Sequence, residues 1–148
     1  YDLDATLEHQ RAYAYLCGRM GRLESALPLY KDILEQTEAE YGNAGNEYAA
    51  ALNNLGMIYD NIGRYSEAEP LLEEALSIRR CVLGSDHPDT ATSLNNLAGL
   101  YLDQGRFVEA ALLSKEAVEI MERGLGAEHP KTKIVRENYE GLLAEMKE

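Results

Sequence analysis

Residues 51–59 read ALNNLGMIY and residues 93–101 read SLNNLAGLY, so the second stretch repeats the first after 42 residues. Both stretches carry two neighbouring asparagines among apolar residues, although Asn is a poorer helix former than Ala. Residues 50–91 laid over 92–133 agree at many further positions, a weaker copy precedes them, and a truncated fourth copy follows. A fixed period of this length predicts a stacked array of repeats rather than one closed core.

Within each period the apolar residues follow the spacing of amphipathic helices. Leu94, Leu97, Ala98 and Tyr101 form one stripe at steps of three and four residues, and a second stripe runs through residues 110–120. We therefore predict an all-α fold of antiparallel helix pairs. About seven helices are expected, at 4–20, 23–41, 47–61, 65–83, 89–103, 107–125 and 131–147.

The connections between these helices carry their own signals. Gly63 and Gly105 follow the first helices of their repeats, where a left-handed residue commonly ends a helix. The pairs His87-Pro88 and His129-Pro130 precede the next helices, and Pro is tolerated in a first helical turn. Because these histidines recur one repeat apart, we expect them to be structural turn residues and not metal ligands.

Composition restricts the function. The 148 residues include 26 acidic and 14 basic side chains, a formal net charge of -12, which argues against nucleic-acid and anionic-membrane partners. No run of 18 apolar residues and no signal-peptide pattern is present, and two cysteines favour a reducing, cytoplasmic location. We expect a single domain over 1–148, with repeats at about 7–48, 49–90 and 91–132 and a C-terminal capping helix at 131–147.

The pattern L-x-x-L-G/A-x-x-Y, followed by G-R-F/Y-x-E-A, resembles the tetratricopeptide repeat. The long period, the NNL triplet and the sequence L-G-x-D/E-H-P are similar to the kinesin light chain type of that repeat. The resemblance is strong over 50–133, weaker over 7–49 and partial over 134–148. It implies a solenoid wound as a right-handed superhelix, in which the first helices of successive repeats line a concave groove.

In similar repeats, residues at the asparagine positions hold the backbone of a bound peptide. On a helix that advances about 100° per residue, Asn95 lies roughly 110° from the centre of the apolar stripe, and Asn53 is equivalent to it, so both are expected to face the groove. A carboxamide there offers donors and an acceptor to a peptide backbone. For Asn54 and Asn96, groove contact and bonding within the array remain equal alternatives. The same registration places further residues along or at the rim of the groove: Arg11, Tyr15, Arg19, Met57, Asp60, Asn61, Gly99, Leu102, Asp103 and Asn138.

Kinesin light chains use a basic groove for aromatic–acidic peptides, and this chain departs from them. The first helices at 47–61 and 89–103 contain no Lys or Arg, so a mixed or weakly charged peptide is favoured over a strongly acidic one. Basic residues instead lie toward the ends of the array, among them Lys131, Lys133 and Arg136, for which solvation is an alternative role. The C-terminal helix is expected to cover the last repeat with an apolar set: Ile134, Tyr139, Leu142, Leu143 and Met146.

No arrangement typical of catalysis, of a cofactor or of a metal site stands out in the sequence. We therefore expect a non-enzymatic adaptor or scaffold that binds a segment of a partner protein. The alternative is a structural piece of a longer solenoid, or a module that self-associates through an uncapped N-terminal end, with no ligand in the groove.

Overall fold

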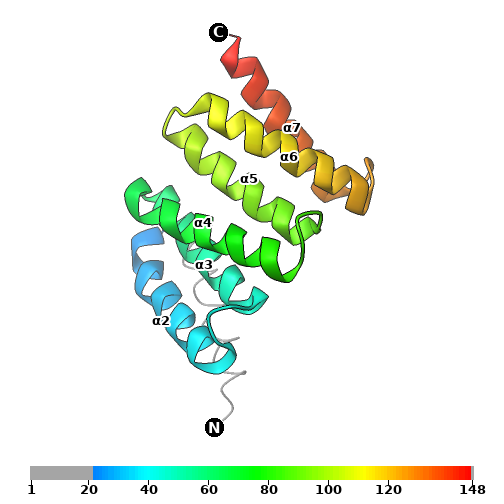
Figure 1. Ribbon diagram of the computed structural model, residues 1–148. Helices are drawn as coiled ribbons and strands as arrows, with labels where there is room; N and C mark the ends of the chain where they lie inside the picture. The colour runs from blue at the N-terminus through cyan, green and yellow to red at the C-terminus, as the bar shows by residue number, and fades with distance from the viewer. Residues whose placement is uncertain (1–21, 148) are drawn as a thin grey trace. The chain divides into compact units, whose positions relative to one another are not determined.

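The computed structural model describes residues 22–147. It contains helices and no strand in this range: α2 (Leu23–Tyr41), α3 (Asn46–Asn61), α4 (Tyr65–Val82), α5 (Pro88–Asp103), α6 (Phe107–Leu125) and α7 (Pro130–Met146) (Figure 1). Each end lies within one residue of the predicted bounds. The all-α prediction is confirmed, and the helix expected at 4–20 lies outside the described residues.

The chain forms two compact units that divide at residue 75, inside α4. In the first unit α2 packs against α3, and α3 contacts the first part of α4. In the second unit α5 packs against α6 and α6 against α7, which lie side by side in Figure 1. Each unit is therefore built from consecutive helices joined by short turns.

The Gly-Arg pair after each first helix closes that helix. The Gly105 N–H donates to the Leu102 carbonyl at 2.9 Å and the Arg106 N–H to the Tyr101 carbonyl at 2.8 Å, the two bonds of a Schellman motif. Gly105 has φ +76°, which favours glycine. The Arg106 guanidinium lies 3.9 Å from the centre of the Tyr101 ring and pairs with the Glu109 carboxylate. The same arrangement recurs one repeat earlier in Tyr59, Gly63, Arg64 and Glu67.

The His-Pro pairs begin α5 and α7. The Nδ1 atom of His87 accepts the Asp89 N–H at 3.0 Å, and the Nδ1 atom of His129 accepts the Lys131 N–H at 3.1 Å. Each histidine is thus the N-cap of its helix, and the following proline occupies the first helical position, where no N–H is needed. The prediction that these histidines are structural turn residues is confirmed.

Small residues allow the two helices of a repeat to approach closely. A Cβ atom at Gly56 of α3 would lie 2.7 Å from Leu72 Cδ2 on α4, and Leu72 is itself fully buried. One repeat later Ala98 takes the place of Gly56, and Ser114 takes the place of Leu72. The larger residue on the first helix is therefore accompanied by a smaller one on the second. Ala26, Ala68 and Ala110, which recur one repeat apart on the second helices, have no exposed surface.

Helix α7 corrects part of the sequence prediction. Ile134 is 56% exposed and Met146 41% exposed, so neither belongs to the buried face that was expected to cover the last repeat. The reason is that α7 packs against α6 along one narrow side. The side chains buried on this helix are Thr132, Val135 and Leu142, and of the remaining expected residues Tyr139 and Leu143 are half-buried.

Candidate functional site

The four asparagines of the repeated NNL stretches differ in exposure. Asn53 is buried, with 8% of its surface exposed, and it takes part in polar contacts, whereas Asn54 is exposed. Asn95 and Asn96 are half-buried, and Asn96 also has a polar contact. Asn54 is therefore more accessible to a ligand than Asn53, whereas Asn53 was favoured for groove contact from the sequence. The cause is the wide buried arc of α3, in which ten of sixteen residues are buried.

The other predicted groove residues are placed as follows. Arg11, Tyr15 and Arg19 lie outside the described residues. Asn61 and Asn138 are exposed, and Asp60, expected at the rim, is instead buried with 6% of its surface exposed. Met57, Gly99 and Leu102 are half-buried, and Asp103 is exposed.

A hollow of about 220 Å³ lies in the second unit, and we call it the α5–α7 hollow. It lies between two successive first helices, α5 and α7, and one residue of α6 also lines it. Asn95, one of the predicted groove residues, lies in its wall. The lining residues are Thr92 and Asn95 on α5, Met121 on α6, and Lys131, Ile134 and Val135 on α7.

The α5–α7 hollow has an apolar base and a polar edge. Met121 and Val135 are 1% and 4% exposed, so the rest of their surface is already packed in the core. Ile134 rises beside them with more than half of its side chain in solvent. The Thr92 hydroxyl donates to the Pro88 carbonyl at 3.2 Å, which leaves the Asn95 carboxamide as the polar group best suited to bond an incoming backbone.

The charge at this edge comes from Lys131. Two neighbouring cations on α7 are paired, since Lys133 meets Glu128 at 3.2 Å and Arg136 meets Glu122 at 2.9 Å. Within the part of the chain that the structure describes, the Lys131 ammonium has no ion-pair partner. Among residues 22–147 the α5–α7 hollow therefore has a cation outside any ion pair beside its apolar surface.

A second hollow, of about 330 Å³, lies in the first unit between α2 and α3, and we call it the α2–α3 hollow. Glu47 occupies the repeat position of Lys131, and Ala50 that of Ile134. The two hollows thus use equivalent positions with opposite charge and different apolar bulk. The described lining of the α2–α3 hollow is Ile33, Asn46, Glu47, Ala50, Ala51 and Asn54.

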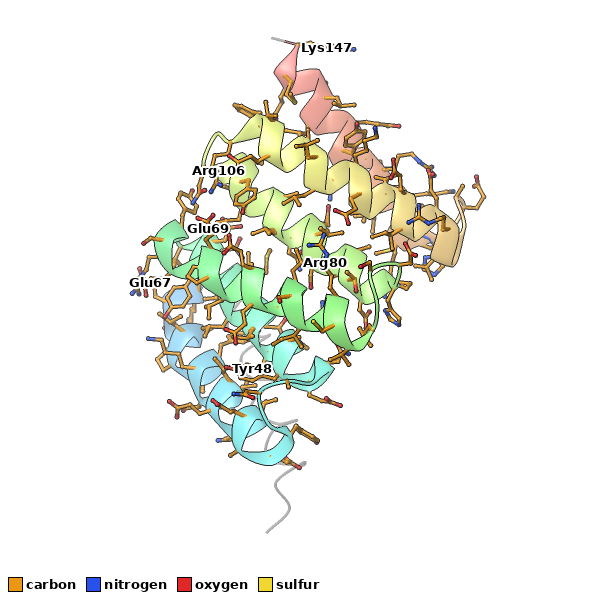
Figure 2. The ribbon with its side chains drawn as sticks, viewed as in Figure 1. Tyr48, Glu67, Glu69, Arg80, Arg106 and Lys147 are labelled. Carbon is orange, nitrogen blue, oxygen red and sulfur yellow. The ribbon has the colours of Figure 1, made fainter. Side chains whose placement is uncertain are left out.

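The second helices present charged pairs away from the hollows. Arg80 on α4, which Figure 2 labels, donates to Glu116 on α6 at 3.0 Å, and both side chains are about two-fifths exposed. Exposed pairs of this kind contribute little stability each. In the described range no group of three His, Cys, Asp or Glu side chains could hold a metal ion. None of the helices from α2 to α7 is long and apolar enough to cross a bilayer.

Burial also perturbs two ionisable groups. Burial lowers the pKa of Arg79 on α4, while the nearby Asp89 charge acts in the opposite direction. Burial raises the pKa of Tyr48 on α3, with smaller contributions from Glu74 and Glu38. Neither group lines the α5–α7 or the α2–α3 hollow, so both shifts reflect packing.

Sequence reasoning did not name four of the six residues of the α5–α7 hollow as ligand contacts: Thr92, Met121, Ile134 and Val135. Asn95 was predicted in the groove, and Lys131 was one of the terminal cations for which solvation was the alternative role. Met121 was not predicted as a ligand contact because it lies on a second helix, and the groove was expected to be lined by first helices alone. Thr92 precedes the asparagine pair by a turn, and Ile134 was assigned to the core. A usable signal was present in the repeat comparison, because Ile134 is the bulkiest residue at a position that is Ala50 two periods earlier.

The family model of the tetratricopeptide repeat matches residues 4–81 and 63–123, which together span most of the chain. The chain belongs to the tetratricopeptide-repeat family. Stacked repeats of this family form protein-interaction scaffolds. No curated protein matches this repeat protein.

Solved structures define the type of repeat. Tetratricopeptide-like repeats of a Podosopora anserina kinesin light chain protein share 25% identity with this chain, with a TM-score of 0.84 over 93% of it. A variant of that protein with one substitution gives 24% identity and the same TM-score over 96% of the chain. BtubC (BKLC) from P. vanneervenii gives 21% identity and a TM-score of 0.76 over 99% of the chain. The repeats are thus of the kinesin light chain type, and the chain covers 65% of the first of these structures.

Proposed function

We propose that this protein binds a segment of a partner protein, extended or helical, on the faces of its first helices. The observation that carries the proposal is the α5–α7 hollow, which lies between two successive first helices. Concave surfaces of stacked repeats commonly serve such contacts. The hollow offers the two features that a peptide site needs, an apolar depression and a carboxamide that can bond a backbone.

The segment would gain affinity from different groups along its length. Its backbone would bond Asn95, and one apolar side chain would cover the exposed part of Ile134. Asn54 and Asn138 are exposed and would add polar contacts on α3 and α7. Smaller contributions to affinity, or contacts at the edge only, are proposed for five further residues: Asn53, Asn96, Met57, Asn61 and Leu102. The proposed contacts also include three residues outside the described range: Arg11, Tyr15 and Arg19.

We further propose that the protein is an adaptor that has no catalytic activity and binds no cofactor. Its proposed location is the cytoplasm. The Nδ1 atoms of His87 and His129 are engaged in helix caps, which supports a structural use of both imidazoles. Cys81 is an exposed free thiol, as suits a reducing compartment.

Selection of peptides from a random phage-displayed library on the immobilised chain tests the proposal. A selected peptide should bind the chain in solution, and Asn95→Ala combined with Ile134→Ser should weaken that binding by about tenfold or more. Leu112→Ser is the matched control, because Leu112 is 65% exposed on α6 and does not line the hollow. No enriched peptide, or equal loss in the control, would refute the proposal.

A second candidate is self-association, which the apolar exposure of α6 favours. Val108 and Leu112 are each 65% exposed and lie one turn apart. Light scattering over a concentration series would show a rising mass if this surface joins two copies, and Leu112→Ser would abolish the rise. A constant monomer mass would remove this candidate. The N-terminal end that the sequence proposed for such contacts lies outside the described residues.

A further inference from the structure

We infer that the α5–α7 hollow selects a partner segment in which an aliphatic side chain lies next to a carboxylate. This inference rests on the proposed function and specifies the chemistry of its ligand. It is carried by the apolar lining of the hollow together with Lys131, which has no ion-pair partner among residues 22–147.

The aliphatic preference follows from the lining. Met121, Ile134 and Val135 supply flexible or branched alkyl groups, and no aromatic ring is among the described lining residues. An aromatic ligand would therefore find no ring to stack on, whereas an aliphatic side chain matches these surfaces. Ile134 stands to lose the most exposed apolar area when the hollow is filled.

The carboxylate preference follows from the position of Lys131. It lies in the first turn of α7, where the helix dipole disfavours a cation. Each of the described helices α2 to α6 has an acidic residue in its first turn, whereas α7 has none. These acidic residues are Glu24, Glu47, Glu67, Asp89 and Glu109. The position of Lys131 is thus unfavourable for the helix dipole, and no carboxylate of the described residues lies within ion-pair distance of it. A ligand carboxylate would supply both the ion pair and the favourable dipole interaction.

The α2–α3 hollow provides an internal contrast. Glu47 stands at the repeat position of Lys131, and Ala50 at that of Ile134. A carboxylate would be repelled there and an aliphatic side chain would find less surface. The preference for an aliphatic–acidic pair should therefore belong to the α5–α7 hollow and not to the α2–α3 hollow.

A panel of capped hexapeptides tests the inference on the full chain. The probes are acetyl-Gly-Ser-Leu-Asp-Ser-Gly-amide and its relatives with Leu replaced by Ala or Trp, or Asp replaced by Asn or Lys. Binding is followed through the methyl NMR signals of Met121, Ile134 and Val135, which also report that the fold is intact. We expect the Leu-Asp peptide to bind about tenfold more tightly than the Leu-Lys peptide, and more tightly than the Ala-Asp and Trp-Asp peptides.

Charge reversal supplies the decisive variant. Lys131→Glu should invert the order so that the Leu-Lys peptide binds better than the Leu-Asp peptide. Lys133→Glu is the matched control, because Lys133 lies two residues away, pairs with Glu128 and does not line the hollow. This control should keep the original order.

The outcomes separate the inference from the function on which it rests. If neither the panel nor the phage library yields a binder, the proposed function fails and the inference fails with it. If library peptides bind but the panel shows no preference for Asp over Lys, or Lys131→Glu does not invert the order, the inference alone is overturned. Stronger binding of the Trp-Asp peptide would likewise overturn the aliphatic preference while the proposed function stands.

Discussion

The guanidinium of Arg79 on α4 donates to the hydroxyl of Ser93 on α5 at 2.9 Å, in a place where both side chains are buried. One repeat later the equivalent positions hold Met121 and Val135, which are also buried and line the α5–α7 hollow. The repeat thus accepts either a polar or an apolar pair between a second helix and the following first helix. The two members change together because a buried polar group needs a partner.

Exchange of this pair gives the first prediction. Arg79→Met alone should lower the free energy of unfolding by about 1–3 kcal/mol, because it leaves the buried Ser93 hydroxyl without its donor. Adding Ser93→Val should recover most of that loss, since an apolar pair can replace a buried polar one. Urea unfolding followed by circular dichroism measures both variants. A double variant that is less stable than Arg79→Met would contradict the equivalence of the two pairs.

The histidine caps give the second prediction. His87→Ala should destabilise the start of α5 by about 0.5–2 kcal/mol, because the Asp89 N–H loses its acceptor. His87→Asn should retain most of the stability, since Asn is an effective N-cap. Hydrogen exchange at the Asp89 amide reports the change locally. Equal protection in the Ala and wild-type chains would show that the cap bond contributes nothing.

The close approach at Gly56 gives the third prediction. Gly56→Ala should cost about 1–3 kcal/mol, because the added methyl group would press on Leu72. In a chain that already carries Leu72→Ala the same change should cost clearly less, and this coupling is measured by a double-mutant cycle. Additive costs would mean that the two side chains do not compete for the same space.

The Arg106–Glu109 pair predicts a pH dependence. Hydrogen bonding from Arg106 holds the pKa of Glu109 below its ordinary value in the folded chain. A lowered folded pKa means that the contribution to stability is present above the pKa of the unfolded carboxyl group and is lost as pH falls through the folded value. The stability difference between wild type and Glu109→Gln should therefore be constant near neutral pH and shrink below about pH 4.

The control for this prediction removes the partner. In an Arg106→Met background, Glu109→Gln should have a smaller effect on stability at neutral pH, because the hydrogen bond that lowers the pKa is gone and only the helix dipole still favours the carboxylate. A pH-dependent difference that is undiminished without Arg106 would assign it to another interaction. Urea midpoints measured across the acid range decide between the two.

The helices could be predicted almost to the residue, because their signals are local. Gly105 and Arg106 close a helix through bonds to residues within the same turn, and His87 opens one through a bond two residues ahead. Such interactions repeat with the sequence and do not depend on distant packing. The 42-residue period then determined their order along the chain.

The site was harder to predict, because exposure depends on several neighbouring helices at once. Angles measured from one apolar stripe placed Asn53 on an open side, but α3 is buried over a wider arc than a single seam accounts for. The same reasoning assigned Ile134 to the core, although α7 buries only a narrow stripe. Met121 enters the hollow from a second helix, a contact that no spacing along α5 or α7 indicates.

The central claim is that ligands bind between successive first helices and not on the second helices of the repeats. A crystal structure of the full chain with the tightest phage-selected peptide tests it most directly. We predict an apolar peptide side chain beside Ile134, between α5 and α7, with the peptide backbone bonded to the Asn95 carboxamide. A peptide seated on the outside of α6 over Val108 and Leu112, with the α5–α7 hollow empty, would contradict the account.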